Sequence, residues 1–482
     1  MPELTGRIRF AHLYRRAGFG ATPAQIDAAI ALHADENTAF NLAVDQLVNY
    51  AATDTFVDRL DPIAANSLTT LIQWWMERLT RTSRPLLERM VLFWHDHFAT
   101  AFGKDGITIS SMKNQNELFR TMAMGSFELL NRAISQDPAM IFWLDLNTNR
   151  KSNPNENYAR ELQELFMLGV GPADGSNPNY TENDIKEVTK VFTGYTVSNN
   201  AFTLNQSNHS TVVKTVRGVT IGPVGSGATL IEPAGTPGDA VIGLLLTAQK
   251  NGRSICARYI AAKIFSYFAY PVSPDNAADD AVVNQFADIF SGAGYAVGPL
   301  VSAILKSNEF SSNLAYRALV RSPVELAVAA FRQLNTERVP ASGSNNVLSN
   351  LQAAGQQLFV PPDVSGWPYG RLWVNDTTML QRCNGNAKII NSTGNAAATE
   401  AGGAQTVPQL LASLVPASPT GAQRVDAVLS LLLDGPSSVP STTRDALITY
   451  ANGISTTNQT TADQQVRGLF NMIMALPAYQ LA

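Results

Sequence analysis

The spacing of apolar residues is the feature that most constrains the fold of this chain. Over residues 1–194, large apolar side chains recur every three or four positions. This spacing collects the apolar side chains on one face of a helix. Two of the segments open with a hydroxyl residue followed three positions later by an amide or an acid, Thr22 with Gln25 and Thr181 with Asp184, which is the pattern of a capped helix N-terminus. The first 194 residues are therefore predicted to be entirely helical.

A different composition follows between residues 195 and 238, where Thr, Val, Asn and Gly dominate. Short alternations of β-branched residues at 211–216, 219–221 and 229–231 are separated by Gly and Asn. Alternation with a period of two favours strands, and Gly and Asn favour the turns of hairpins. Helical spacing then resumes and continues to the C-terminus. The predicted fold class is mostly α: a large, bundle-like helical domain with a small β-hairpin insertion near 195–235.

The periodicity also sets expected helix positions. The principal predicted helices are 37–51, 67–81, 84–101, 112–134, 138–145, 155–168, 237–249, 251–269, 277–291, 297–306, 313–334, 345–357 and 376–391.

Residues 391–406 read NSTGNAAATEAGGAQT, with one charged residue and no large apolar side chain. Such a composition indicates a surface linker. The predicted division is a main helical domain over 1–390 that contains the β insertion, this linker, and a C-terminal helical segment over 407–482 that packs on the main domain.

Composition excludes several classes of function. There are 35 Lys and Arg against 39 Asp and Glu, a net charge of −4, whereas nucleic-acid binders carry a surplus of basic residues. Apolar runs such as 241–248 are too short to span a bilayer, and the first 18 residues show no signal peptide. Two cysteines, Cys256 and Cys383, are too few for a disulfide framework, and Cys256 is predicted to be a buried thiol.

Common catalytic motifs are missing: the chain has no phosphate-binding loop of the GxxxxGK[ST] type, no HExxH, no GxSxG and no CxxC. The strongest chemical candidate is Phe-Trp-His-Asp-His-Phe at 93–98. On a helix, His95 and His97 lie about 160° apart around the axis, so they cannot bind the same ion. Either both histidines form hydrogen bonds with neighbouring helices, or one is a metal ligand with partners from elsewhere. His97 is expected to point inward.

The segment 155–164 contains the residues that could partner these histidines. Glu156, Arg160 and Glu164 are spaced four residues apart, which favours a ladder of salt bridges. Glu161 lacks such a partner at the edge of the apolar face. It is either a carboxylate at the edge of the core, paired with an arginine such as Arg89, or a functional group that faces a polar cavity.

A metal site can be assembled from these residues. In that hypothesis a divalent ion activates water or polarises a substrate oxygen. Glu161 and Arg160 are the candidate catalytic residues, with Arg160 orienting the carboxylate. The candidate metal ligands are His97, Glu161 and His209, with His95 as a further candidate. The hypothesis requires the predicted helices 84–101 and 155–168 to pack side by side, with His97 and Glu161 facing a shared polar cavity.

The loop at 359–374, FVPPDVSGWPYGRLWV, is rich in proline and aromatic residues. Its candidate binding residues are Trp367, Tyr369 and Trp373, which could stack on sugar rings or cover a cleft. Alternatively the loop plugs the core between helical halves. The plug is the favoured interpretation, because a long uncovered aromatic loop is costly in water.

Six segments together resemble a bacterial family known as domain of unknown function 1800. They are HLYRRAGFGAT (12–22), RPLLERMVLFWHDHFAT (84–100), NPNENYARELQELFMLGVG (153–171), YTENDIKEVTKVFTGY (180–195), SPVELAVAAFRQL (322–334) and PPDVSGWPYGRLW (361–373). They run in family order over nearly the whole chain. The resemblance implies a helical architecture and matches His209 and Lys214 to a histidine and lysine pattern, but it carries over no reaction, cofactor or catalytic residue.

The same resemblance bears on location and partners. Many relatives look exported, to the periplasm or the cell exterior, and are often encoded beside a second family that resembles sulfatases. A sulfatase-like protein is thus the partner that the resemblance implies. The leader of such relatives is not visible here, so the location stays open.

Two hypotheses for function remain. The first is a non-catalytic scaffold or surface-assembly protein, favoured by the missing catalytic motifs and by a charged fraction of only 15%. The alternative is a metal-assisted hydrolase or related enzyme acting on an extracellular polymer, favoured by polar residues clustered within apolar helices. Whether the chain is an enzyme stays open from the sequence.

Overall fold

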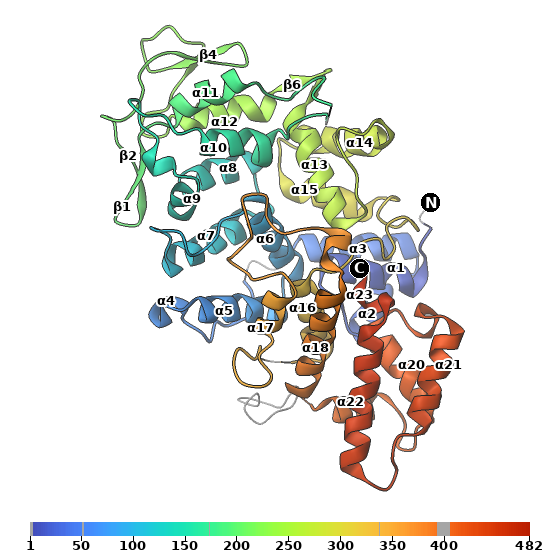
Figure 1. The fold of residues 1–482 in the computed structure, drawn as a ribbon. Coiled ribbons are helices and arrows are strands. Elements are labelled where there is room, and N and C mark those ends of the chain that lie inside the picture. The colour runs from blue at the N-terminus through green and yellow to red at the C-terminus, as the bar shows by residue number, and fades with distance from the viewer. Residues whose placement is uncertain (1–2, 51–52, 173, 337, 393–404) are drawn as a thin grey trace. The chain divides into compact units, whose positions relative to one another are not determined.

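The computed structural model describes residues 3–50, 53–172, 174–336, 338–392 and 405–482. It is mostly helical with small two- and three-stranded sheets, which confirms the predicted fold class (Figure 1). The chain divides into two compact units. Unit 1 comprises Met1–Arg89, Leu305–Leu358 and Pro368–Ala482, and unit 2 comprises Met90–Ile304 and Phe359–Trp367. Most of the linker predicted at 391–406 lies outside the described residues, so the division at that linker stays a prediction.

Unit 1 is built from helices. They are α1 (Gly6–Ala17), α2 (Pro23–Ile30), α3 (Glu36–Val48), α4 (Pro62–Ala65), α5 (Leu68–Arg81), the first residues of α6 (Pro85–His97), α16 (Pro323–Gln333), α17 (Leu348–Ala353), η4 (Gly370–Trp373), α18 (Asp376–Ser392), α19 (Val407–Leu414), α20 (Gly421–Leu432), η6 (Pro436–Ser438), α21 (Ser441–Asn452), α22 (Gln459–Ala475) and α23 (Pro477–Gln480). Helix α16 packs on α5 and α18, and α22 packs on α18, α20 and α21.

The remaining elements belong to unit 2, apart from the last residues of α15. They are α7 (Ile109–Met122), α8 (Phe127–Ser135), α9 (Pro138–Trp143), η1 (Leu146–Thr148), α10 (Asn157–Glu161), η2 (Leu162–Met167), α11 (Glu182–Val191), β1 (Tyr195–Ser198), β2 (Ala201–Leu204), β3 (Lys214–Val216), β4 (Val219–Gly222), β5 (Leu230–Ile231), α12 (Gly238–Thr247), β6 (Gln249–Lys250), β7 (Arg253–Ser254), α13 (Ile255–Phe268), η3 (Ala277–Asp279), α14 (Asp280–Gly292) and α15 (Val297–Lys306).

The two capped helix starts predicted from the sequence are present in the structure. The Thr22 side chain accepts a hydrogen bond from the Gln25 amide, and the Gln25 side chain reaches back to the Thr22 amide. Thr181 and Asp184 form the same reciprocal pair at the start of α11. These side chains satisfy backbone N–H groups that have no partner within the helix, which stabilises each start by about 1 kcal/mol.

Several predicted helices have different bounds, and three of them show why. The segment predicted at 112–134 is two helices, α7 and α8, because Ser126 caps a new helix by accepting from the Leu129 amide. The segment predicted at 313–334 becomes helical only at α16, where Ser322 and Glu325 form a capping box. The segment predicted at 251–269 begins with a hairpin, and its helix starts at α13.

The hairpin β6–β7 occupies the predicted first turn of that helix. Asn251 and Gly252 connect its strands with positive φ angles of 53° and 77°. Two central residues with positive φ make the type I′ turn, for which Asn-Gly is the preferred pair. The Ser254 side chain then accepts from the Ala257 amide and begins α13.

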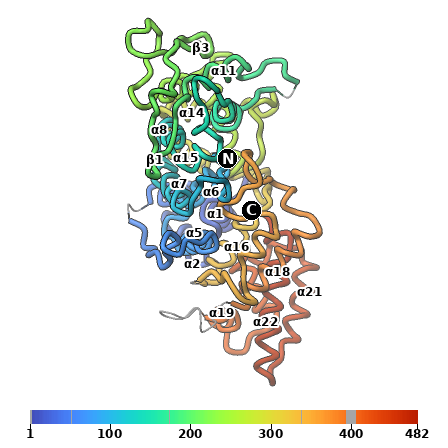
Figure 2. Tube along the Cα trace, turned by 60° about the vertical axis from the view of Figure 1, so that its left-hand side comes forward, coloured from blue at the N-terminus to red at the C-terminus, as the bar shows by residue number. Residues whose placement is uncertain are grey.

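The β insertion lies where the sequence predicts it. Strands β1 and β2 form an antiparallel hairpin in which Tyr195 pairs with Leu204. Strands β3 and β4 are also antiparallel, and β5 joins β4 in parallel through Ile221 and Leu230. Strand β3 packs along α11 (Figure 2).

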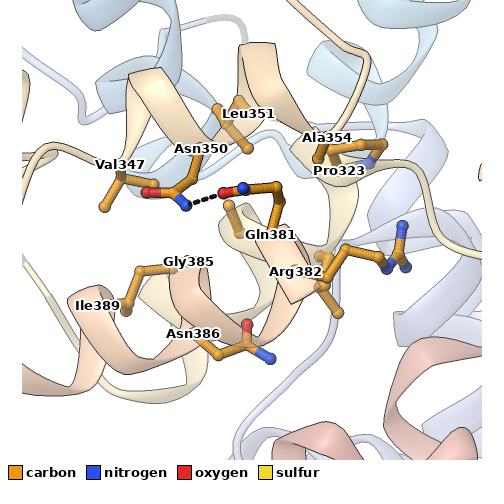
Figure 3. Close-up of a pocket in the computed structure, with 12 residues that line it drawn as sticks. Pro323, Val347, Asn350, Leu351, Ala354, Gln381, Arg382, Gly385, Asn386 and Ile389 are labelled. Carbon is orange, nitrogen blue, oxygen red and sulfur yellow. Dashed lines mark hydrogen bonds between the residues drawn. The ribbon is translucent and has the colours of Figure 1, made fainter. Parts of the chain in front are cut away.

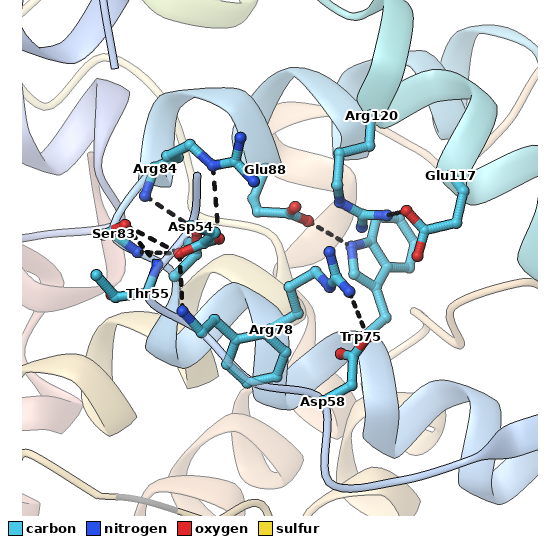
Figure 4. A network of polar contacts seen from close by, with 12 residues as sticks. Asp54, Thr55, Asp58, Trp75, Arg78, Ser83, Arg84, Glu88, Glu117 and Arg120 are labelled. Atoms are coloured by element: carbon cyan, nitrogen blue, oxygen red, sulfur yellow. Dashed lines mark hydrogen bonds and ion pairs between the residues drawn. The ribbon is translucent and has the colours of Figure 1, made fainter. Parts of the chain in front are cut away.

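In unit 1, a polar network ties the 54–58 loop to the connection between α5 and α6 (Figure 4). Asp54 accepts from the Ser83 amide at 3.0 Å and from the Thr82 hydroxyl. Burial alone raises the pKa of Asp54, but these hydrogen bonds outweigh it and hold the pKa at about 2. The Trp75 indole donates to Glu88 at 3.0 Å. The network therefore fixes the start of α6, the helix that carries His95 and His97.

A small cavity of about 20 Å³ lies among α16, α17 and α18 (Figure 3). The Asn350 amide donates to Gln381 across it at 2.8 Å. That volume has room for a single water molecule. The cavity is a packing gap between helices and is too small for an organic ligand.

Candidate functional site

His97 ends α6 inside an aromatic shell. Its Nε2 lies 3.1 Å from the carbonyl oxygen of Phe166, and its ring stacks on Phe93. Burial, reinforced by the nearby Lys263, lowers the pKa of His97 well below its usual value, so the ring is neutral. Nε2 therefore carries the proton and donates it to the carbonyl. The buried Nδ1 has no hydrogen-bond partner within the described part of the chain.

The shape of the 155–168 segment makes the Phe166 carbonyl available. Helix α10 is followed by η2, a stretch of π-helix. At its end the Leu168 amide donates to the Gln163 carbonyl, five residues back. A helix end leaves its last carbonyls without partners inside the helix. One of them, on Phe166, is satisfied by His97, so the two segments meet at this hydrogen bond.

Glu161 lies half-buried at the junction of α10 and η2. Among the described residues it forms no hydrogen bond or ion pair, either with His97 or with any other group. Burial, followed by the charge of Glu164, raises the pKa of Glu161 to about 7. The alternative partner suggested by the sequence, Arg89, instead pairs with Glu325 in unit 1.

Arg160 does not orient Glu161. Its guanidinium binds Glu156 at 2.8 Å and Glu182 at 2.9 Å. The predicted salt-bridge ladder is therefore present only in its first half. Glu164, its predicted third member, accepts a hydrogen bond from the Tyr180 hydroxyl at 2.9 Å.

His95 is buried on another side of α6. Its Nε2 accepts a hydrogen bond from the Phe359 amide at 3.1 Å, and its ring packs against Trp367. Burial lowers the pKa of His95 to about 3. Because Nε2 accepts, this nitrogen is already occupied and holds the loop at 359–367 against α6.

His209 lies in the β insertion, next to a buried ion pair. Its Nδ1 donates to the Thr193 carbonyl at 2.9 Å, and its Nε2 lies 3.5 Å from Glu232. The ammonium of Lys214 contacts the other oxygen of Glu232 at 2.6 Å. Burial lowers the pKa of Lys214, and Glu232 opposes that shift. His209, Lys214 and Glu232 thus form one buried cluster, the insertion triad.

The structure does not bring the candidate metal ligands together. His97 donates to a backbone carbonyl, and His95 accepts from a backbone amide. His209 contacts the Thr193 carbonyl and Glu232. In the part of the chain that the structure describes, no three His, Cys, Asp or Glu side chains are placed to hold a metal ion. Both cysteines are free thiols, and burial raises the pKa of Cys256.

The three candidate aromatic residues of the 359–374 loop differ in burial. In unit 2, Trp367 is buried, and its amide donates to the Asp96 carboxylate at 2.7 Å. Gly366 has a φ of 87° and lies so close to Asp96 that a Cβ would overlap the carboxylate. In unit 1, Trp373 is buried, whereas Tyr369 is 55% exposed. Each tryptophan is therefore buried within its own unit, and the tyrosine lies at the surface, while the binding role of the loop stays a prediction.

Sequence reasoning missed a pocket in unit 2. It has a volume of about 320 Å³ and lies among residues 168–172 and 177–179, the β6–β7 hairpin, the start of α13 and the 274–284 segment. Its charged lining includes Lys250 and Arg258. The Asn251-Gly252 pair is a local hairpin signal that could have located one wall of this pocket.

The raised pKa of Glu161 predicts a pH-dependent stability. A carboxyl whose folded-state pKa of about 7 exceeds its usual 4.5 contributes most below pH 4.5, and that contribution is lost as the pH rises through 7. Glu161→Gln should therefore be more stable than the parent chain at pH 8 by about 1 kcal/mol, a value discounted for solvent screening. Urea titrations at pH 4.5 and pH 8 measure the difference. Glu156→Gln, which loses the Arg160 contact, should show no such gain, and a gain of the same size would contradict the prediction.

The fold and the site define a mostly helical protein whose buried histidines join segments distant in the sequence. The family model described as "Protein of unknown function (DUF1800)" matches residues 12–481, nearly the whole chain. The chain therefore belongs to the DUF1800 family. Comparisons with curated proteins and with solved structures found no match. Among the described helices, none combines the length and apolar character needed to cross a bilayer.

Proposed function

We propose that this chain is a non-catalytic scaffold that works in a surface or assembly process. The observation that carries the proposal is the use of the candidate imidazoles. His97 donates to η2, His95 accepts from the 359–367 loop, and His209 bonds within the β insertion. His97 and His95 bond to residues 69 and 264 positions away, and His209 bonds to the Thr193 carbonyl next to the insertion. Each of these hydrogen bonds stabilises one arrangement of the backbone.

Buried charges support the same proposal. Arg89 and Glu325 pair within unit 1, and Lys214 and Glu232 pair within unit 2. Buried pairs of this kind contribute little net stability relative to apolar residues, but removing one partner is strongly destabilising. They are consistent with a chain selected for one rigid shape.

A measurement of metal binding distinguishes the scaffold proposal from the alternative, a metal-assisted hydrolase acting on an extracellular polymer. We expect the purified protein to contain no stoichiometric metal by elemental analysis. Its melting temperature should be unchanged by Zn²⁺, Mn²⁺ or Ca²⁺, because no three His, Cys, Asp or Glu side chains among the described residues are placed to hold an ion. Differential scanning calorimetry gives the second measurement.

The matched variants are His97→Gln, which retains a donor near the position of Nε2, and His33→Gln, which alters an exposed histidine. One bound ion per chain in the parent and in His33→Gln, lost in a folded His97→Gln, would overturn the scaffold proposal. It would favour the hydrolase and assign His97 as a ligand.

The partner that we propose is a sulfatase-like protein, the class that the family resemblance implies. Mixed purified proteins should elute together in size-exclusion chromatography with light scattering, at a mass equal to the sum of both. An unrelated sulfatase is the control. Separate elution of the two proteins at micromolar concentration would remove this partner from the proposal.

A further inference from the structure

The pocket in unit 2 is formed by residues other than the candidate histidines. Its volume of about 320 Å³ falls within the range of small-molecule sites. Four segments contribute to its wall, and all four lie within the same compact unit. Leu168 and Ile255 give it apolar surface, and Tyr259 adds an aromatic ring. The Tyr259 hydroxyl is already engaged, since it donates to the Leu165 carbonyl at 2.9 Å.

Lys250 is the cation of this pocket that lacks an anionic partner. Its ammonium donates to the Asn179 side-chain oxygen at 3.0 Å and to the Asn177 carbonyl. Both acceptors are neutral, and none of the described carboxylates forms an ion pair with Lys250. An ammonium has three N–H donors, so one donor remains. Asp275, which also lines the pocket, acts on the ammonium through its charge without forming an ion pair with it, so the positive charge is only partly offset.

The neighbouring charges are of both signs, since Asp275 and Asp280 line the pocket together with Arg253 and Arg258. Arg258 lines the pocket and is held by Asp280 at 2.8 Å and by the Pro274 carbonyl. Burial lowers the pKa of Lys250; Asp275 opposes this shift, and Arg217 and Arg258 reinforce it. Arg253, the other cation of the lining, is paired with Asp288 through two hydrogen bonds of 3.1 and 3.2 Å.

We propose that this pocket binds a small ligand through an anionic group, a carboxylate or a phosphate, that contacts the ammonium of Lys250. Charge-assisted hydrogen bonds to such a group are about twice as strong as neutral ones. Arg258 and Asn284 line the same pocket but are already engaged, since Asn284 accepts a hydrogen bond from the Arg258 guanidinium, which also pairs with Asp280. This site is independent of the scaffold proposal, because a scaffold and an enzyme could both use it.

Inorganic phosphate and citrate are the two probes, since they separate the phosphate source from the carboxylate source. Each is titrated into the full chain at constant ionic strength, with sodium chloride as the reference, and binding is followed by isothermal titration calorimetry. We expect saturable binding of at least one probe. Lys250→Met should weaken it at least tenfold, and Lys250→Arg should retain it within a few-fold.

The matched control is Lys388→Met. Lys388 also donates to a backbone carbonyl, that of Asn346 at 3.1 Å, but it lies in unit 1. The Lys388→Met variant should bind the probe with the same affinity as the parent chain. Saturable binding by neither probe at millimolar concentration would overturn the proposal, and so would unchanged affinity in Lys250→Met.

Hydrogen exchange on the parent chain keeps the test independent of the folding of the variants. The probe that binds should slow exchange of amides in 249–259 and 274–284 and leave the β insertion unchanged. Protection confined to other segments would place the anion elsewhere and overturn the assignment.

Discussion

Asp434→Asn is expected to lower the free energy of unfolding of unit 1 by about 3–5 kcal/mol, the cost of leaving a buried charge without its partner. The Asp434 side chain is 1% exposed and contacts Arg15. Its other oxygen accepts from the Tyr316 hydroxyl at 2.6 Å and lies 3.2 Å from the Arg317 guanidinium. Asparagine keeps the shape but leaves two guanidinium groups without a carboxylate.

The three partners explain why the effect should be large. Arg15 belongs to α1, Tyr316 and Arg317 follow α15, and Asp434 follows α20. One carboxylate thus joins segments from the start, middle and end of the sequence. Urea titration followed by circular dichroism measures the loss, and hydrogen exchange in α20 and α22 confirms that unit 1 is the part affected.

Asp426→Asn provides the matched control. Asp426 also pairs with an arginine, Arg444, through hydrogen bonds of 2.8 and 2.7 Å. Both of these side chains are about one-third exposed, so water screens the pair and its loss should cost less than about 1 kcal/mol. Equal losses in the two variants would contradict the importance of burial at Asp434.

Glu232→Gln is expected to destabilise the β insertion by about 3 kcal/mol. It leaves the ammonium of Lys214, whose side chain is fully buried, without the negative charge of its carboxylate partner, while neutral acceptors such as the Ser210 carbonyl at 2.6 Å remain. Native-state hydrogen exchange of amides in 210–232 measures the local free energy of opening. Since η2 and α6 lie outside the insertion, their exchange should change much less.

A double variant tests the physical reason for this effect. Lys214→Met combined with Glu232→Met removes both charges, and it should recover more than half of the loss, because apolar residues replace buried ion pairs at little cost. Lys190→Met, which removes a 39% exposed lysine paired with Glu187, should change stability by less than about 1 kcal/mol. A double variant as unstable as Glu232→Gln would contradict the ion-pair explanation.

Much of the fold could be predicted from the sequence, because helices and hairpins depend on neighbours in the chain. The capping residues Thr22 and Thr181 bond three positions ahead, so their function is visible in the sequence itself. The alternation within 195–235 likewise revealed the β insertion. The hairpin at Asn251 and Gly252 also depends on neighbouring residues. It was missed because the helix predicted from the apolar spacing began at residue 251, several residues before the observed start of α13.

The candidate site was less predictable. The sequence correctly indicated that His95 and His97 are on one helix, and the structure gives them different partners. The sequence could not predict that η2 would be π-helical, or that this would present the Phe166 carbonyl to His97. Nor could it predict that Arg160 would bind Glu182, which leaves Glu161 without an ion-pair partner among the described residues.

The sequence by itself therefore determined the family, the helical class, the helix starts with clear capping residues and the place of the β insertion. All of these follow from interactions over a few residues or from patterns of residue type. Tertiary structure alone decided which polar atoms meet: His95 bonds to Phe359, 264 positions away, and Arg15 to Asp434, 419 positions away. Such pairs form because a buried polar group without a partner costs free energy, and the packed chain determines which partner is within reach.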